Sequence, residues 1–292
     1  MIISRLIGGL GNQMFQYAVA RALAEKTHQH LKLDVSSFST YKLHNGFELV
    51  SIFEGNKELA TAEDVRSMLG LQSFPMLKRL LLRFELNWLR SKNLIVEPHF
   101  QYWDGLEYIL KDAYLTGYWQ SEKYFKSIEA TVRSDFTFKQ PMSRVNQNIA
   151  NNIAQADSVS LHVRRGDYVQ NSLTLAAHGI CPLEYYQSAI AYMTERVAQP
   201  KFFIFSDDIE WVKNNIRINF SCQYVENNHG AESYNDMRLM SLCKHHIIAN
   251  SSFSWWGAWL NASPNKIVIA PKQWFANDKN VSDLFPLDWI AI

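Results

Sequence analysis

Hydrophobic and polar positions along the chain follow the pattern of strands that alternate with helices. A strand-like apolar stretch at 2–7 leads into glycines 8, 9 and 11, and apolar positions from Phe15 to Leu23 then recur at helical spacing. A second short strand ends at Asp34. Residues 1–35 are therefore predicted to form a strand, a helix and a strand.

The same alternation fills the second half of the chain, after a polar stretch around 140–157. The predicted strands are 158–163, 201–208, 222–225, 246–250 and 266–270, and the predicted helices between them are 182–198, 209–215, 232–244 and 253–262. Strands that alternate with helices indicate parallel sheets covered by helices. We predict an α/β fold of two Rossmann-like domains facing a cleft, at 1–150 and 151–292.

The middle of the chain adds a helix at 61–69, where Thr61 is the expected cap and Asp64 completes a capping box. The following segment, 74–92, is both apolar and basic, with five positive charges against one negative charge from Lys78 to Lys92. A basic amphipathic helix lies on an anionic membrane surface or packs as an ordinary helix with a solvated basic edge. We favour the ordinary helix.

Composition narrows the class of protein. The chain has 292 residues, of which 47% are hydrophobic, and a formal net charge of +1, so nothing indicates bulk binding to nucleic acid. Its three cysteines are few and widely spaced, which argues against a disulfide framework or a zinc knuckle and favours a reducing compartment. We expect no signal peptide and no membrane-spanning run, hence a cytoplasmic protein, with peripheral contact at the inner membrane left open.

The glycine-rich turn has several interpretations. A dinucleotide fingerprint needs a third glycine, but that position is Met14, and no Gly-Lys-Ser/Thr follows for a phosphate loop. A tight turn with Asn12 capping the helix is the simpler interpretation. Asn12 and Gln13 also suit a polyhydroxylated ligand, because each amide offers donors and an acceptor.

Charged residues end the strand at 158–163. In open α/β sheets ligands bind outside the carboxyl ends of the strands, and His162, Arg164 and Arg165 lie there. A guanidinium clamps phosphate through its fork of N–H donors, while Arg165 and Asp167 could form a plain salt bridge. We expect one arginine to bind a ligand phosphate and the other to be structural.

Ser206, Asp207 and Asp208 end the next strand. They resemble part of a metal site, but a hard divalent cation needs several converging oxygens, and the remaining ligands are not evident. We expect Ser206 and Asp207 to cap the following helix, and we expect no metal.

The segment 232–260 combines an acid with a serine turn. Asp236 lies on a predicted helix, and its carboxylate suits the adjacent N1–H and N2–H₂ donors of guanine. A turn that opens a helix directs N–H groups and hydroxyls at an anion; the alternative for these serines is N-capping, and for Trp255 and Trp256 it is core packing. The serines of this turn are Ser251, Ser252 and Ser254.

The motifs "GGLGNQMFQYA", "HVRRGDY" and "SSFSWWGAWL", in this order and spacing, resemble the bacterial α-1,2-fucosyltransferases of glycosyltransferase family 11. "TGYWQSEKYF" and "FSDD" also look like that family, and the resemblance runs from Ile3 to about residue 275. It implies a GT-B fold, GDP-fucose as donor, inversion at the anomeric carbon and no metal or other cofactor.

The resemblance also implies site residues. Arg164 is expected on the β-phosphate and Asn12 near the reaction centre, as the catalytic pair. Expected donor-binding residues are Gly9, Gly11, His162, Arg165, Asp236, Ser251, Ser252 and Ser254. Expected acceptor-binding residues are Gln13, Trp119 and Gln120.

The expected reaction is transfer of L-fucose from GDP-β-L-fucose to the 2-hydroxyl of a terminal β-galactoside, free or lipid-linked, in a surface polysaccharide such as O-antigen. Alternatives are a fucosyltransferase of other regiochemistry, a glycosyltransferase with another donor, and a carbohydrate-binding protein without catalysis, with a dinucleotide oxidoreductase more distant. Sequence singles out no general base.

Overall fold

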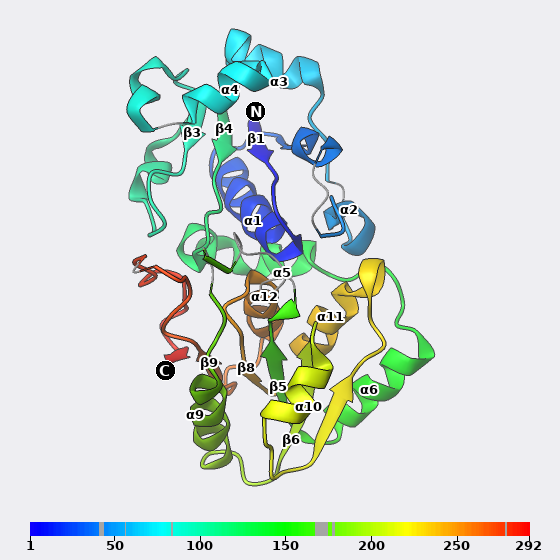
Figure 1. The fold of residues 1–292 in the computed structure, drawn as a ribbon. Helices are drawn as coiled ribbons and strands as arrows, with labels where there is room; N and C mark the ends of the chain where they lie inside the picture. Colours follow the sequence, from blue (N-terminus) through cyan, green and yellow to red (C-terminus); the bar gives the residue numbers. More distant parts are fainter. Residues whose placement is uncertain (41–43, 56, 83, 167–174, 177–178, 278) are drawn as a thin grey trace. The chain divides into compact units, whose positions relative to one another are not determined.

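The chain folds into two units, seen in a computed structural model that describes residues 1–292 except 41–43, 56, 83, 167–174, 177–178 and 278 (Figure 1). The first unit is Met1–Lys139 with Ser282–Leu284, and the second is Gln140–Val281 with Phe285–Ile292. The boundary precedes the helix α6 (Arg144–Ala154), which packs against β5 and α11 of the second unit. The boundary expected near residue 150 therefore falls inside a helix of the second unit.

The first unit is built on a parallel sheet with the strand order β2-β1-β4-β3. Its strands are β1 (Ile2–Arg5), β2 (Leu31–Asp34), β3 (Leu94–Val96) and β4 (Ala113–Thr116). Its α-helices are α1 (Leu10–Lys26), α2 (Leu49–Ile52), α3 (Ala62–Leu69), α4 (Pro75–Leu81) and α5 (Glu129–Asp135). Short 3₁₀ turns are η1 (Ser36–Ser39), η2 (Gly70–Ser73), η3 (Phe84–Leu89), η4 (Asp104–Tyr108), η5 (Glu122–Tyr124) and η6 (Lys126–Ile128).

The second unit has a wider parallel sheet with the strand order β10-β9-β8-β5-β6-β7. Its strands are β5 (Asp157–Val163), β6 (Pro200–Ser206), β7 (Cys222–Val225), β8 (His245–Ile247), β9 (Val268–Ala270) and β10 (Ile290–Ala291). In addition to α6, its described α-helices are α9 (Leu183–Thr194), α10 (Ile209–Asn215), α11 (Tyr234–Leu242) and α12 (Ser252–Leu260). A 3₁₀ turn, η7 (Gly230–Glu232), precedes α11.

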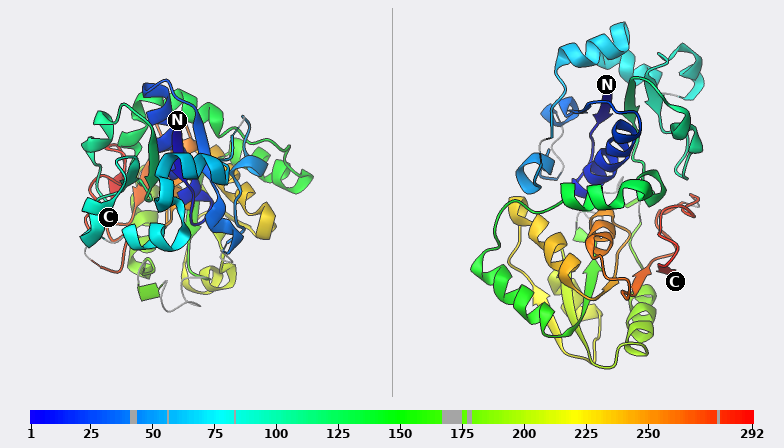
Figure 2. Two further views of the ribbon diagram at one scale, coloured as in Figure 1. Left: turned by 90° about the horizontal axis from the view of Figure 1, so that it is seen from above. Right: turned by 180° about the vertical axis from the view of Figure 1, so that it is seen from behind.

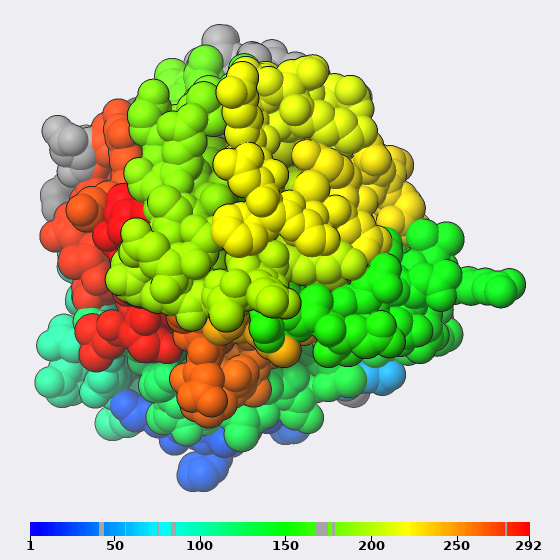
Figure 3. Space-filling view, turned by 90° about the horizontal axis from the view of Figure 1, so that it is seen from below, coloured from blue at the N-terminus to red at the C-terminus, as the bar shows by residue number. Residues whose placement is uncertain are grey.

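Alternating side chains along β5 and β6 give this sheet two apolar faces. Val159, Leu161 and Val163 of β5 pack with α9 and α10 on one face. Phe203 and Phe205 of β6 pack with α6 and α11 on the other, and these layers can be followed in Figures 1 and 2. Seen from below, α6 (green) lies beside the yellow segment around β7 (Figure 3). Because successive side chains of a strand alternate in direction, His162 shares the face of α11 and α12.

The predicted strand, helix and strand at 1–35 are confirmed, as is the alternation in the second half. Thr61 caps α3, and its capping box with Asp64 is present. The prediction of a single helix over 74–92 is wrong, because α4 ends at Leu81 and η3 carries a non-helical Leu86. None of the described helices is long and apolar enough to cross a membrane.

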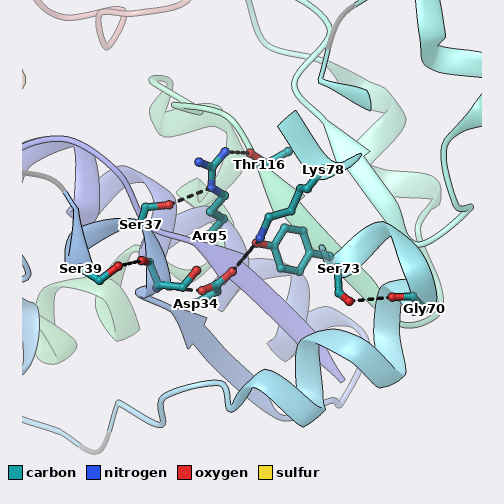
Figure 4. Close-up of polar contacts among 10 residues, drawn as sticks. Arg5, Asp34, Ser37, Ser39, Gly70, Ser73, Lys78 and Thr116 are labelled. Atoms are coloured by element: carbon teal, nitrogen blue, oxygen red, sulfur yellow. Dashed lines mark hydrogen bonds and ion pairs between the residues drawn. The ribbon is translucent and has the colours of Figure 1, made fainter. Parts of the chain in front are cut away.

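A buried ion pair ties α4 to the edge of the first sheet (Figure 4). The ammonium of Lys78 lies 3.3 Å from a carboxylate oxygen of Asp34 and 2.8 Å from the hydroxyl of Tyr114. Asp34 also accepts a hydrogen bond from the Tyr114 hydroxyl. Nearby, Arg5 contacts the hydroxyls of Ser37 and Thr116. Lys78 is therefore part of the core, not of the solvated basic edge expected from the sequence.

The Lys78→Met substitution should lower the free energy of unfolding by about 3 kcal/mol, because it leaves the carboxylate of Asp34 buried without a cation. Urea unfolding of both proteins at neutral pH measures this difference. Arg79→Met is the matched control, since Arg79 is the exposed neighbour on the same helix. Equal losses in the two variants would contradict the structural role of Lys78.

Candidate functional site

The loop after β5 is held by the residue that follows the neighbouring strand β6. One carboxylate oxygen of Asp207 accepts the N–H of Arg165 at 2.8 Å, and the other lies 3.3 Å from the Nε of Arg164. Burial raises the pKa of Asp207, but the Arg164 guanidinium and the N–H groups of Gly166 and Arg165 outweigh it and hold that pKa below its usual value. The ionised carboxylate thus positions Arg164 at the carboxyl edge of the sheet.

Arg165 has a different environment. Its guanidinium lies over the ring of Trp211 at 4.3 Å, and its Nε lies 3.6 Å from a carboxylate oxygen of Asp208. Both contacts are typical of a structural arginine and favour Arg165 as the structural one of the two arginines, while its expected role in donor binding stays a prediction. The alternative partner considered for it, Asp167, lies outside the described residues.

Asp208, rather than Asp207, caps the next helix. Its carboxylate accepts the N–H of Trp211 at 3.2 Å, and its own N–H donates to the hydroxyl of Ser206 at 2.9 Å. The predicted capping role of Asp207 is wrong, because that carboxylate is used by the β5 loop. Among the described residues, no group of three or more His, Cys, Asp or Glu side chains is placed to hold a metal ion.

His162 is buried on the face shared with α11 and α12. Its ring lies 6.0 Å from that of Phe253, and its Nδ1 has no hydrogen-bond partner among the described residues. Burial, and secondarily the charge of Arg164, lower the pKa of His162 to about 3 against the opposing effect of Asp207. The imidazole is therefore neutral, with one ring nitrogen left for a ligand hydrogen bond.

The serine turn that opens α12 uses most of its hydroxyls internally. Ser251 caps the helix by accepting the N–H of Phe253 at 3.3 Å. The hydroxyl of Ser254 accepts the N–H of Ala249 at 3.2 Å and donates to the carbonyl of Ser251 at 3.3 Å. Ser252 is half-buried, and no described residue hydrogen-bonds its hydroxyl. The hydroxyls of Ser251 and Ser254 thus serve the turn itself, and the ligand contacts expected of them stay predictions. Ser252 and the first-turn N–H groups are the better placed candidates.

The tryptophans after this turn belong to the core. Trp255 and Trp256 are fully buried, with their rings 5.0 Å apart and nearly perpendicular. The core-packing interpretation is confirmed for both. Their bulk fixes α12 against the sheet and so fixes the direction of its N-terminus.

Asp236 lies half-buried on α11. Its Oδ1 accepts a hydrogen bond from the Nδ2 of Asn228 at 2.8 Å, and its Oδ2 has no hydrogen-bond partner among the described residues. Burial raises the pKa of Asp236 to about 7, and the Asn228 bond opposes the rise. The site thus offers a carboxylate oxygen that a ligand with adjacent N–H donors would satisfy.

The glycine turn of the first unit is followed by two side-chain amides, those of Asn12 and Gln13, which have different environments. Gly8 has a φ of +81°, and a Cβ there would lie 2.7 Å from the Nδ2 of Asn12, so only glycine fits. Helix α1 begins at Leu10 with Gly9 as its cap, so Asn12 does not cap it. The Asn12 amide instead pairs with Gln120 at 2.7 Å. Gly11 is buried inside the first turn of α1.

All three residues expected to contact acceptor, Gln13, Trp119 and Gln120, are buried. Gln13 donates to the carbonyls of Gly8 at 3.0 Å and Gly46 at 2.8 Å, and accepts the N–H of Glu48 at 3.0 Å. Trp119 is 1% exposed. The side chains of Gln13 and Trp119 serve packing or backbone hydrogen bonds in this structure, and the acceptor contacts expected of them stay predictions.

Gln120 follows β4, on the same edge of the sheet as Asn12 after β1. Its second amide atom, Oε1, is buried without a partner among the described residues. Asn12 and Gln120 therefore remain as candidate acceptor contacts.

Sequence reasoning missed the asparagines beside Asp236. Asn228 is buried in the loop after β7 and bonds Asp236 directly. The available signal was "ENNHG", two consecutive amides at the carboxyl end of a predicted strand, which is where a ligand site was already expected.

Known proteins resemble this chain along its whole length. The model of the family described as "Glycosyl transferase family 11" matches residues 76–292. An Escherichia coli alpha-1,2-colitosyltransferase is 37% identical over 100% of this chain and 99% of its own length. The E. coli O-antigen biosynthesis glycosyltransferase WbnK is 35% identical over 99% of both chains.

The fold also matches a solved structure. A crystal structure of NodZ alpha-1,6-fucosyltransferase soaked with GDP-fucose covers 92% of this chain and 94% of that chain, with a TM-score of 0.55 and 16% identity. This similarity confirms the GT-B fold class predicted from the sequence.

The different environments of Asn12 and Gln13 lead to different effects on stability. Gln13→Ala should lower the free energy of unfolding by about 2 kcal/mol or more, because three backbone groups, two of them buried, lose their partner. Asn12→Ala should cost less, about 1 kcal/mol, because it removes a single part-buried hydrogen bond, the one from Gln120. Urea unfolding of the two variants tests this, and a larger loss for Asn12→Ala would contradict it.

Proposed function

The chain belongs to glycosyltransferase family 11, and we propose that it transfers L-fucose from GDP-β-L-fucose to the 2-hydroxyl of a terminal β-galactoside. The observation that carries the proposal is the set of groups at the carboxyl edge of the second sheet. A positioned guanidinium, a carboxylate with an unbonded oxygen and a helix N-terminus follow β5, β7 and β8 respectively. These groups match the phosphates and the guanine base of a GDP-sugar.

The donor is assigned group by group. Asp236 accepts the N1–H and N2–H₂ donors of guanine. Ser252 and the first-turn N–H groups of α12 bind the pyrophosphate, and Arg164 binds its β-phosphate. His162 is neutral and offers Nδ1 to the nucleoside.

The proposed chemistry is an inverting displacement. The acceptor 2-hydroxyl attacks C1 of fucose, the bond from C1 to the β-phosphate oxygen breaks, and GDP leaves with the electron pair. The hydroxyl proton is lost late, to water, and no residue is assigned as its base. Negative charge grows on the β-phosphate in the transition state, where preorganised donors stabilise it most. We propose that Arg164 and α12 supply this stabilisation without a metal.

In the first unit, the Asn12–Gln120 pair is the proposed acceptor contact. An amide hydrogen-bonds a hydroxyl as donor and as acceptor, so Asn12 orients the attacking hydroxyl. One E. coli relative is named for an α-1,2 transfer and the other for O-antigen biosynthesis, which supports an α-1,2 linkage and a surface polysaccharide as acceptor. The terminal galactose is part of our proposal.

A second donor is favoured by one finding, the 37% identity to an alpha-1,2-colitosyltransferase. Colitose lacks the 3-hydroxyl of fucose but shares its 6-deoxy-L configuration, so the same nucleotide site would serve GDP-colitose. A transfer assay read by mass spectrometry, with GDP-fucose and GDP-colitose in EDTA against a panel of β-galactosides, separates the two donors. Transfer that requires added metal, or no transfer from either donor, would contradict the proposal.

Arg164→Ala should lower turnover by on the order of 10²–10³, the loss expected when one preorganised donor to the developing charge is removed. Arg165→Ala is the matched control. It should lower the free energy of unfolding, because the Trp211 stack is lost, while folded enzyme keeps most of its turnover. Initial rates at saturating GDP-fucose measure the turnover of the two variants. Wild-type turnover in Arg164→Ala would remove Arg164 from the mechanism.

We also propose that the enzyme works at the inner membrane, where a lipid-linked acceptor would lie. Large apolar side chains are exposed around α4, η2 and η3, with Leu71 75%, Met76 89% and Trp88 76% exposed. These three elements pack together, and the exposed cations Arg79 and Lys92 belong to the same stretch. Apolar anchors with neighbouring cations are typical of a surface that binds anionic phospholipid.

The double variant Met76→Ser with Trp88→Ser should lose most binding to phosphatidylglycerol vesicles, while the wild type sediments with these vesicles and not with neutral phosphatidylcholine vesicles. Leu287→Ser is the control, since Leu287 is 99% exposed outside this surface. Equal sedimentation of the wild type and the double variant would contradict the proposed surface.

A further inference from the structure

Asp236 is the end of a chain of hydrogen-bonded amides, of which two are buried and the third, Asn227, is exposed. The Nδ2 of Asn228 donates to Asp236 at 2.8 Å, and the Oδ1 of Asn228 accepts from Asn146 at 2.9 Å and from Asn227 at 2.9 Å. Asn227 also donates to the Oδ1 of Asn146 at 2.8 Å. This amide relay, defined as Asn146, Asn227 and Asn228, joins α6 and the loop after β7 to α11.

The carboxylate sets the direction of every bond in the relay. An ionised carboxylate only accepts hydrogen bonds, so Asn228 must present its NH₂ group to Asp236 and its carbonyl oxygen to the other two amides. Asn146 is 2% exposed and Asn228 is 8% exposed. A buried amide that is hydrogen-bonded through both its oxygen and its nitrogen, as Asn228 is, holds one orientation, because a flip would face donor with donor and leave Asp236 without its N–H.

We infer that Asn228, fixed by Asn146 and Asn227, is a positioning residue that orients Asp236 so that its Oδ2 accepts the N–H donors of guanine. This inference rests on the proposed GDP-sugar function. Adenine presents an acceptor at N1 where guanine presents a donor, so a fixed carboxylate oxygen rejects it. The relay therefore contributes to selection of the base as well as to affinity.

Through Asn228, the relay also lowers the pKa of Asp236 against the larger effect of burial. Ionisable side chains on the elements around Asp236 are Arg144, Glu226, His229, Glu232, Tyr234 and Arg238. None of these is a cause of the raised pKa of Asp236, which comes from burial and is opposed by the Asn228 bond. Guanine binds the ionised form, so GDP affinity should rise with pH up to about 7 and then level off.

The test is the pH dependence of GDP binding, measured by calorimetry from pH 5.5 to 9 with ADP as the competitor base. Asn228→Ala removes the bond that lowers the pKa of Asp236, so the midpoint of the profile should move to higher pH. Affinity at pH 7 should fall about tenfold, the value of one hydrogen bond to a charged group. The preference for GDP over ADP should shrink.

Three further variants keep the result interpretable. Asn146→Ala leaves Asn228 in place and should shift the midpoint in the same direction by a smaller amount. Asp236→Asn should remove the part of the pH dependence that GDP does not share with ADP, since the terminal phosphates of both nucleotides titrate alike at about pH 6. Asn152→Ala, on an exposed part of α6, should behave as wild type. A wild-type profile in both folded relay variants would overturn the inference, whereas absence of GDP binding by the wild type at every pH would overturn the proposed function itself.

Discussion

The carboxylate of Asp207 joins the ends of β5 and β6, since it accepts the N–H of Arg165 and pairs with the guanidinium of Arg164. The proposed donor site depends on this interaction. Without it, the loop after β5 would lose the bond that fixes its direction, and Arg164 would lose an ion pair. Space is tight at the same point, because a Cβ on Gly166 would lie 3.1 Å from the carbonyl oxygen of Asp207.

Side chains of β5 alternate between the two faces of the sheet, so the proposed ligand-binding residue and the core residues lie on opposite faces. His162 lies on the face of α11 and α12, where Phe253 contacts it. Its neighbours Leu161 and Val163 lie on the opposite face, in the core against α9. Beyond the strand, Arg164 meets Asp207 while Arg165 stacks on Trp211. Adjacent residues of one short motif therefore have different roles.

The sequence predicts the helices, the strands and the sheet edges where polar residues gather. It does not predict the hydrogen-bond partner of each polar side chain. Strands, helices and the Thr61 cap follow from local periodicity and capping chemistry, which the sequence contains directly. Gln13 and Ser254 looked available for ligands, yet their partners are backbone groups placed by the tertiary fold. The bond from Asn228 to Asp236 depends on packing of the loop after β7 against α11, so no local pattern predicts it.

The most direct test of the central claim is a crystal structure of the protein with GDP. The account predicts the nucleotide at the carboxyl edge of the second sheet, with guanine on Asp236 and the β-phosphate on Arg164. GDP bound instead at the glycine turn of the first unit, between Gly8 and Gln13, would contradict the account.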